Sequence, residues 1–316
     1  MGTQLPFRFG IFSHNTSPSP ERLRSQARLA EDLGYSTFLV PDHLGDQFAP
    51  ALALLQAAQA TTTLHIGSFV FANDFRHPLL LAKEAATLDA FSNGRFEFGL
   101  GAGWMRSEYE QIGLSFEAPS VRIERMGEAL RLIKDFFTRD ELSFSGSYYT
   151  VKALPCLPRV VQAPHPPIYV GGSGKRMLTL AAQEATCVGL IPRVRYARRG
   201  GHMNDVLDVE DASAAATKQK LGWIREAAGA RFDELELNIV LMDVRITEHK
   251  QQALQEYMER YALSEEELEK CSFLLIGDKE EVIDKVKFIR EEYGVTYFVA
   301  WEEHIQQLAP VVAQLS

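Results

Sequence analysis

Cysteine is scarce in this chain of 316 residues, which contains only Cys156, Cys187 and Cys271. An odd number at wide spacing indicates neither a disulfide framework nor a zinc site, so we expect a reducing, cytoplasmic location. The 8 histidines form no H-x-H or H-E-x-x-H pattern, and no metal site is predicted. A G-x-S-x-G motif is also missing, which argues against a hydrolase of the nucleophile-elbow type.

Long apolar runs are missing as well. No stretch of about 18 apolar residues occurs, so we expect no membrane-spanning segment. Residues 1–6 have no basic region followed by an apolar stretch, so no secretory signal is predicted. The 42 acidic and 33 basic side chains give a formal net charge of −9, which argues against nucleic acid or an anionic membrane as the main partner.

Strand-like and helix-like segments alternate along the chain. The expected strands are residues 7–12, 37–40, 64–70, 96–100, 168–170, 187–191, 235–245 and 296–301. Helices are predicted at residues 20–33, 50–60, 78–91, 121–137, 175–185, 213–228, 249–270 and 280–293. Eight strands interleaved with helices favour an α/β fold, a single (β/α)8 TIM barrel, over the alternative of a doubly wound open sheet.

Two stretches interrupt the alternation. Residues 138–165 are typical of short aromatic hairpins, and residues 193–211 form a polar excursion. The basic run in that excursion is either solvated or receives a phosphate or an acidic part of a substrate; it comprises Arg193, Arg195, Arg198 and Arg199. No linker rich in Pro, Gly or Ser divides the chain, so we expect one domain, 1–316, with insertions after strands 4 and 6. Capping-box spacing at Ser264 and Glu267 predicts a break in the helix at 249–270.

Candidate functional residues follow the predicted strands, because function in such barrels gathers at the carboxyl ends of the strands. Asp42 and His43 follow strand 2, and a histidine beside a carboxylate suits acid–base chemistry. The alternative is that Asp42 caps a helix and His43 packs beside it. Gly67, within strand 3, indicates a bulge or a close backbone approach, with a plain strand end as the alternative.

Glycines alternate at the end of strand 4, at Gly99, Gly101 and Gly103. The spacing is not a dinucleotide fingerprint, because position 104 is Trp104. Such glycines allow other backbone or a flat ligand to come close. Glu108, shortly after them, is either an acid or a solvated helix charge.

A second glycine-rich segment follows strand 5 and leads into a helix. It comprises Gly171, Gly172, Ser173 and Gly174, followed by Lys175 and Arg176. Backbone N–H groups, the positive end of a helix dipole and two cations together suit a phosphate group. The alternative is a flexible turn. The sequence therefore favours a phosphate site at this loop.

Taken together, these segments resemble the luciferase-like monooxygenase superfamily, the bacterial-luciferase-type barrels that use a flavin or the deazaflavin coenzyme F420. The matching motifs are Pro41-Asp42-His43, Arg76-His77-Pro78, Ala85-Ala86-Thr87-Leu88-Asp89, Ser92-Asn93-Gly94-Arg95, Gly99-Leu100-Gly101-Ala102-Gly103-Trp104 with Glu108-Tyr109, and Val170-Gly171-Gly172-Ser173-Gly174. The resemblance covers nearly the whole chain and is strongest to the branch of F420-dependent oxidoreductases.

The resemblance implies a role for each matching residue. His43 would lie near the reactive carbon of the ring and act as proton donor or oxyanion stabiliser, and Asp42 would position it or contact the cofactor. Glu108 matches an acid of some deazaflavin members. Phe69 and Val70 match the position of a non-proline cis peptide that backs the ring in relatives.

The same resemblance places the cofactor phosphate at Gly171, Gly172, Ser173 and Gly174. It predicts hydride transfer between reduced F420 and a small organic substrate, in a homodimer, with an FMN-dependent monooxygenase or reductase as the alternative. His14 and Asn15 follow strand 1 at the same rim and are candidates for the substrate pocket. Two other hypotheses stay open: a non-catalytic barrel that has lost its cofactor, and a lyase or isomerase that binds a phosphate ester.

Overall fold

Eight parallel strands close into a barrel. The computed structural model describes residues 5–14, 19–199, 202–261 and 263–316, and of residues 194–199 and 202–207 it describes the backbone alone. The barrel strands in this part of the chain are β1 (Arg8–Phe12), β2 (Thr37–Val40), β3 (His65–Ser68), β5 (Phe96–Gly101), β8 (Ile168–Gly172), β9 (Cys187–Leu190), β12 (Glu236–Val240) and β15 (Val295–Trp301). Their order is β3-β2-β1-β15-β12-β9-β8-β5, and pairing of β3 with β5 closes the barrel. The predicted TIM barrel is confirmed.

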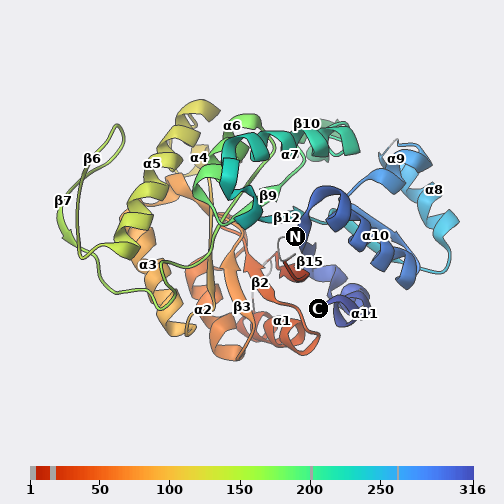
Figure 1. The fold of residues 1–316 in the computed structure, drawn as a ribbon, viewed down its shortest axis with the longest axis horizontal. Helices are drawn as coiled ribbons and strands as arrows, with labels where there is room; N and C mark the ends of the chain where they lie inside the picture. The colour runs from red at the N-terminus through yellow and green to blue at the C-terminus, as the bar shows by residue number, and fades with distance from the viewer. Residues whose placement is uncertain (1–4, 15–18, 200–201, 262) are drawn as a thin grey trace.

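A helix follows each barrel strand and packs on the outside of the barrel (Figure 1). These helices are α1 (Pro20–Asp32), α2 (Pro50–Ala60), α3 (Pro78–Phe91), α5 (Pro119–Thr138), α6 (Lys175–Glu184), α7 (Ala214–Ala228), α10 (Lys279–Tyr293) and α11 (Ile305–Leu315). The first four begin with proline, whose fixed φ and missing N–H suit the first turn of a helix. Among the described residues, no helix is long and apolar enough to cross a membrane.

Insertions follow the fourth and sixth barrel strands, as predicted. After β5 come a short helix, α4 (Arg106–Gln111), then α5 and the antiparallel hairpin of β6 (Glu141–Ser145) and β7 (Thr150–Pro155). After β9 comes a second antiparallel hairpin, β10 (Val194–Arg199) with β11 (His202–Leu207). The basic run was predicted in this segment. The side chains of Arg195, Arg198 and Arg199 lie outside the described part of the structure.

A third insertion, after β12, was not predicted. It consists of β13 (Asp243–Ile246), α8 (Lys250–Tyr261), α9 (Glu265–Lys270) and β14 (Leu274–Gly277). The apolar run continues past Val240, but the backbone hydrogen bonds change partner: the Leu241 N–H donates to Val299 of β15, and the Met242 N–H donates to Phe273. β13 then pairs in parallel with β14 outside the barrel. The single strand predicted at 235–245 is therefore wrong in its second half.

Several smaller elements complete the fold. They are β4 (Phe71–Ala72), η1 (Asn73–Phe75), η2 (Gly229–Glu234) and η3 (Glu302–His304). The strand predicted at 64–70 ends at Ser68, because the chain bends there before β4. The break predicted near Ser264 is confirmed, since Ser264 and Glu267 form a capping box at the start of α9.

The side chains of the barrel strands alternate between two environments. Those that face outward, such as Phe9, Phe38 and Phe298, are buried under the helices in one large apolar core. Those that face inward at the amino ends of the strands include a cluster of charged groups. This cluster is centred on Arg8, the first residue of β1.

Arg8 binds two carboxylates inside the barrel. Its Nη1 donates to Glu236 Oε2 at 2.7 Å, and its Nη2 donates to Glu97 and to Thr37 Oγ1, the latter at 2.9 Å. His65 Nδ1 lies 3.1 Å from Glu97 Oε1. Burial alone would raise the pKa of Glu97, but Arg8 and His65 hold it below the usual value. Burial raises the pKa of Glu236, and the nearby Glu97 raises it further against the attraction of Arg8.

The two carboxylates should therefore respond differently to neutralisation. The depressed pKa of Glu97 means that its ionised form stabilises the fold above an unfolded pKa of about 4.3, and that this stability is lost as pH falls through the folded pKa. The raised pKa of Glu236 has the opposite sign, so ionised Glu236 weakens the fold at pH 7. We predict that Glu97→Gln lowers the free energy of unfolding at pH 7 much more than Glu236→Gln, as measured by urea denaturation.

Arg8→Met should cost about 3 kcal/mol, because it leaves two buried carboxylates without their cation. Arg139→Ala is a matched control, since that side chain is 58% exposed and pairs only along its own helix with Asp135. Its loss should cost well under about 1 kcal/mol. Equal losses in Glu97→Gln and Glu236→Gln would contradict the assignment of opposite pKa shifts.

Candidate active site

Asp42 follows β2 and is held by an arginine from the next loop. Its Oδ2 and Oδ1 accept hydrogen bonds from Arg76 Nη1 and Nη2 at 2.7 and 2.9 Å, and Oδ2 also accepts from the Ala72 N–H at 2.9 Å. Although burial opposes it, the hydrogen bonds and charge of Asp42 raise the pKa of the Arg76 guanidinium. Asp42 thus joins the end of β2 to the segment after β3, and it does not cap a helix.

His43 is paired with a buried carboxylate. Its Nδ1 lies 3.0 and 3.1 Å from the two carboxylate oxygens of Glu108, which also accepts from the Leu44 N–H at 2.9 Å. Glu108 is only 6% exposed, so it is not a solvated helix charge. A carboxylate can only accept here, which assigns the Nδ1 proton and leaves Nε2 available for other partners. The ring of Trp104 lies edge-on to His43, with centroids 5.9 Å apart.

A backbone shelf lies between β3 and β4. The peptide bond between Phe69 and Val70 is cis, at the position that the resemblance implied. Ser68 Oγ donates to the Gly99 carbonyl at 2.8 Å and accepts from the Gly99 N–H at 3.0 Å. A Cβ on Gly99 would collide with the Ser68 carbonyl, and one on Gly101 would lie 2.6 Å from Val70 Cγ2. Gly99 therefore admits other backbone, the first of the two predicted explanations, whereas Gly101 leaves room for the Val70 side chain.

Aromatic side chains line the inside of the barrel below this shelf. The Phe69 ring lies 5.4 Å from Phe12 and 4.8 Å from Tyr169, measured between centroids. Phe12 in turn contacts Trp301 edge-on at 4.7 Å, and His14 stacks on Trp301 at 4.6 Å. Burial raises the pKa of the Tyr169 hydroxyl well above its usual value, so this group stays protonated. The carboxyl end of the barrel thus has an apolar, aromatic floor.

The glycine-rich loop begins inside β8 and ends at α6. A Cβ on Gly171 would lie 2.6 Å from the Tyr169 hydroxyl, and one on Gly172 would collide with Met177. Gly174 is the N-cap of α6; it is exposed, and a Cβ there would meet open space. No described side chain caps this helix, so its first N–H groups have room for an external acceptor.

The structure brings most of the predicted residues to one end of the barrel. His43 and Glu108 pair directly, and Asp42 precedes His43 in sequence. Phe69 and Val70 follow β3, and the loop at 171–174 lies at the carboxyl end of β8. His14 also lies at this rim, with its Nε2 3.4 Å from Glu303 Oε2, whereas Asn15 lies outside the described residues.

Several contributors were missed by the analysis of single motifs. Arg76 was noted only as part of a matching motif, although it holds both oxygens of Asp42. Tyr169 and Trp301 form the floor but carry no local signal beyond an aromatic residue in a strand. Side chains of a barrel strand alternate between the inside and the outside of the barrel. This alternation in β8 and β15 identifies both residues as inward-facing.

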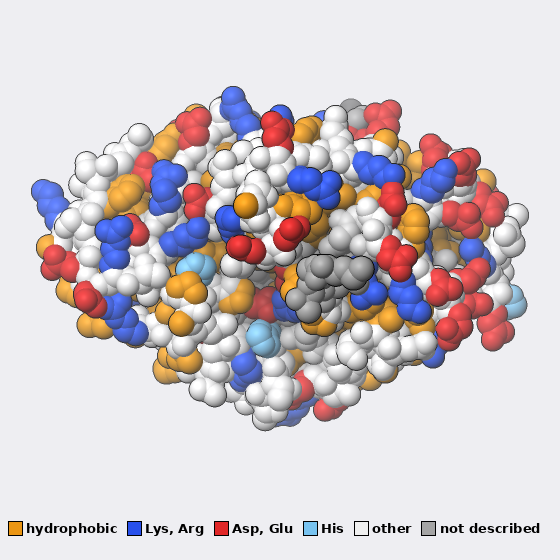
Figure 2. Space-filling view, in the orientation of Figure 1, with side chains coloured by type: hydrophobic (Ala, Val, Ile, Leu, Met, Phe, Trp, Pro, Cys, Tyr) orange, Lys and Arg blue, Asp and Glu red, His pale blue; other side chains and the backbone are white. Residues whose placement is uncertain are grey.

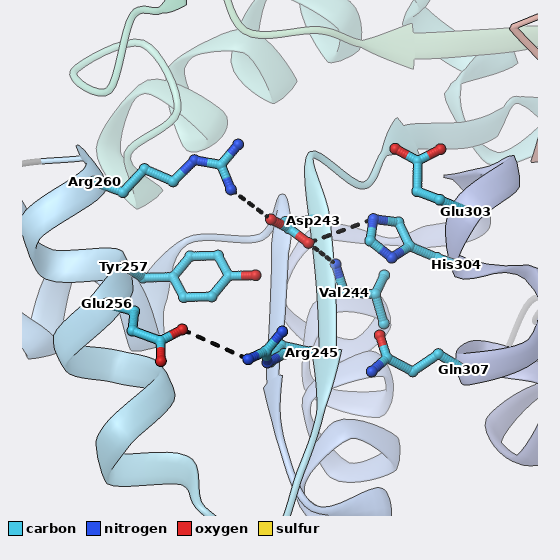
Figure 3. Close-up of a pocket in the computed structure, with 9 residues that line it drawn as sticks. All are labelled: Asp243, Val244, Arg245, Glu256, Tyr257, Arg260, Glu303, His304 and Gln307. Atoms are coloured by element: carbon cyan, nitrogen blue, oxygen red, sulfur yellow. Dashed lines mark hydrogen bonds and ion pairs between the residues drawn. The ribbon is translucent and has the colours of Figure 1, made fainter.

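A separate polar pocket of about 310 Å³ lies where the third insertion meets the last helix (Figure 3). Asp243 stands at its centre: Arg260 Nη1 donates to Oδ2 at 3.1 Å, and His304 Nε2 lies 3.4 Å from Oδ1. Arg245 and Glu256 face each other across 3.6 Å. These charges compensate one another, and no group of His, Cys, Asp or Glu in the described residues is arranged to hold a metal. The contact between Asp243 and His304 therefore joins the third insertion to the segment that leads into the last helix.

Comparison with known families identifies the barrel. The model of the luciferase-like monooxygenase family matches residues 1–297. The chain belongs to this family. The match includes the residues of the His43–Glu108 pair, the cis peptide at Phe69 and Val70, and the glycine loop before α6.

Curated relatives include enzymes that differ in cofactor. The chain is 32% identical over 189 residues to an F420-dependent glucose-6-phosphate dehydrogenase of Microbacterium testaceum, an alignment that covers 57% of this chain and 55% of that one. It is 34% identical over 106 residues to the FMNH(2)-dependent dimethylsulfone monooxygenase of Pseudomonas putida, covering 34% and 29%. These alignments span about half and under a third of the two relatives. A third, with the F420-dependent glucose-6-phosphate dehydrogenase of Nakamurella multipartita, covers 80% and 72% at 28% identity.

Solved structures agree on the fold. The coenzyme F420-dependent tetrahydromethanopterin reductase from Methanopyrus kandleri superposes with a TM-score of 0.77 at 19% identity, covering 99% of this chain and 100% of that one. The long-chain alkane monooxygenase LadA also gives a TM-score of 0.77, at 16% identity, covering 99% and 92%. These likenesses support the barrel fold.

The shelf depends on glycine at position 99, which gives a direct test. We predict that Gly99→Ala lowers the free energy of unfolding by about 2–3 kcal/mol, because the added methyl group overlaps the Ser68 carbonyl. Gly222→Ala is the matched control: Gly222 lies in α7 with open space around it, and alanine should stabilise that helix by up to about 1 kcal/mol. If Gly99→Ala unfolded like the wild type in urea, the close approach of the two strands would be disproved.

Proposed function

We propose that this protein transfers a hydride between reduced coenzyme F420 and a small organic substrate, with His43 as proton donor or oxyanion stabiliser. The observation that carries the proposal is the fixed His43–Glu108 pair at the rim of the barrel. The F420-dependent relatives support it, because they include the longest of the three alignments described above. The bound cofactor would supply the hydride, and the protein would supply binding, orientation and a proton.

The residues at the rim suit a flat ring with a phosphate-bearing tail. The backbone at Phe69 and Val70 forms a shelf above an aromatic floor, which favours a planar, largely apolar group. The uncapped N-terminus of α6 behind Ser173 and Gly174 favours a phosphate. This shelf also disfavours the lyase or isomerase hypothesis, since a phosphate ester alone needs no such surface.

Glu108 determines what His43 can do. By accepting a hydrogen bond from the Nδ1–H group it fixes the orientation of the ring. A protonated Nε2 can then donate to an oxygen that gains negative charge during the reaction. Asp42, whose oxygens are taken by Arg76 and Ala72, acts as a positioning residue for the loop that carries His43.

FMN remains the second candidate cofactor, because the name of the Pseudomonas putida relative specifies FMNH(2). With FMN the same rim would serve a monooxygenase or a reductase. Binding of neither cofactor would favour the non-catalytic hypothesis. Formation of a homodimer and a cytoplasmic location stay predictions from the sequence.

Titration with F420 and with FMN, each oxidised and reduced, tests the proposal. We expect tighter binding of F420 than of FMN, followed by the fluorescence of the deazaflavin and by absorbance. The reverse preference would overturn the F420 assignment. Gly174→Val should weaken binding of either cofactor at least about tenfold without unfolding the protein, because its side chain would fill only the open space before α6. Unchanged affinity in Gly174→Val would disprove the phosphate loop.

His43 and Glu108 should affect turnover more than affinity. Removing a proton donor that acts in the reaction lowers kcat by roughly 10²–10⁴-fold, and we expect this for His43→Ala with little change in cofactor affinity. Glu108→Gln should give a smaller loss of kcat, because the amide oxygen can still accept the hydrogen bond from Nδ1 and hold the ring. Steady-state kinetics and cofactor titration measure both effects. Equal losses of kcat and affinity in His43→Ala would assign His43 to binding instead.

A further inference from the structure

A second pocket lies outside the barrel, between α8, α9, α10 and β14. Its volume is about 320 Å³, and its apolar wall consists of Leu254, Leu268, Ile276 and Phe288. Figure 1 shows α8, α9 and α10 together at one end of the molecule. The residues of the proposed active site come from other elements, so this pocket is separate from that site.

Lys285 of α10 lines this pocket without a carboxylate partner. Its Nζ donates to the Leu268 carbonyl at 3.3 Å, and among the described residues no Asp or Glu oxygen lies within ion-pair distance of it. Lys250 instead binds two acids that also line the pocket, Glu269 at 3.2 Å and Glu281 at 3.1 Å. The amine of Lys285 therefore shares the pocket with an apolar wall and makes no ion pair in the part of the chain that the structure describes.

The surroundings of Lys285 are otherwise acidic. Figure 2 shows acidic side chains gathered over this end of the molecule. Of the groups that act on Lys285, Glu269 and Cys271 raise its pKa and Lys250 lowers it, while Glu281 and Asp284 also line the pocket. Burial nevertheless prevails and lowers the pKa of Lys285 to about 8. The neutral, nucleophilic fraction of this amine near neutral pH is thus larger than that of an ordinary lysine.

We propose that this pocket binds small aliphatic aldehydes covalently, through a reversible imine on Lys285. The amine nitrogen attacks the carbonyl carbon and forms the new C–N bond. The carbonyl oxygen takes up the two protons that the amine loses and leaves as water, so no oxidant or reductant is needed. The apolar wall would hold the alkyl chain, which favours an alkyl aldehyde over a polar one. The proposal is independent of the cofactor and of the proposed function.

Labelling with butanal and cyanoborohydride tests this inference, since the reductant converts an imine into a stable secondary amine. Lys287 is the internal control, because it lies on the same helix, is 44% exposed and pairs with Asp284. Peptide mass spectrometry should show Lys285 labelled at least about tenfold faster than Lys287 at pH 7.5, since an ordinary lysine has a pKa of about 10.4. The labelling rate of Lys285 should rise with pH and level off above about pH 8.

Two further measurements distinguish binding of the aldehyde in the pocket from a reactivity of Lys285 that depends only on its low pKa. Glycolaldehyde, which is small and polar, should give a clearly smaller ratio of Lys285 to Lys287 labelling than butanal gives. Lys285→Met should keep or raise the melting temperature, because it removes a partly buried amine that makes no ion pair among the described residues. Equal labelling of the two lysines would overturn the reactive-lysine proposal. An equal labelling ratio for both aldehydes would overturn the role of the apolar wall.

Discussion

The interior of the barrel depends on inward-facing positions that have no side chain. Gly10 leaves room for the Tyr297 ring, Gly171 and Gly189 leave room for Tyr169, and Gly99 allows Ser68 to approach β5. Each of these contacts would be blocked by a single Cβ atom. Large aromatic side chains can therefore extend across the barrel. If every inward-facing position carried a side chain, no space would be left for these rings.

This arrangement divides the barrel into two layers. At the amino ends of the strands, Arg8 forms a polar cluster with Glu97 and Glu236, and each carboxylate pairs with its guanidinium group. At the carboxyl ends, Phe12, Phe69 and Trp301 form an apolar floor. In the charged layer Arg8 links β1 to β5 and β12, and the aromatic layer leaves the rim free for chemistry. The two layers lie at opposite ends of the strands. This separation matches the usual division of a TIM barrel into a stabilising amino-terminal end and a functional carboxyl-terminal end.

Much of the fold was predictable because local signals agreed with the tertiary structure. The helices at 50–60 and 78–91 begin and end where proline and apolar spacing predicted. The prediction failed at residues 241–246, where an apolar strand pattern continues but the hydrogen-bonding partner changes from β15 to the β14 region. Periodicity reports which face of a strand is buried and does not report which strand lies beside it. That information exists only in the folded chain.

The sequence predicted which residues belong to the site better than it predicted what each of them contacts. His43 and Glu108 were both proposed, but they are 65 residues apart, and no spacing rule joins them. The glycine loop is the more instructive case. Of its four residues, Gly171 and Gly172 are glycine because Tyr169 and Met177 occupy the adjacent space, which is an internal packing reason. Only Gly174 has open space beside it, and Ser173 precedes it at the helix start. A phosphate group held here would therefore be bound by the last two residues of the loop and the first turn of α6, and the first two glycines would serve the barrel instead.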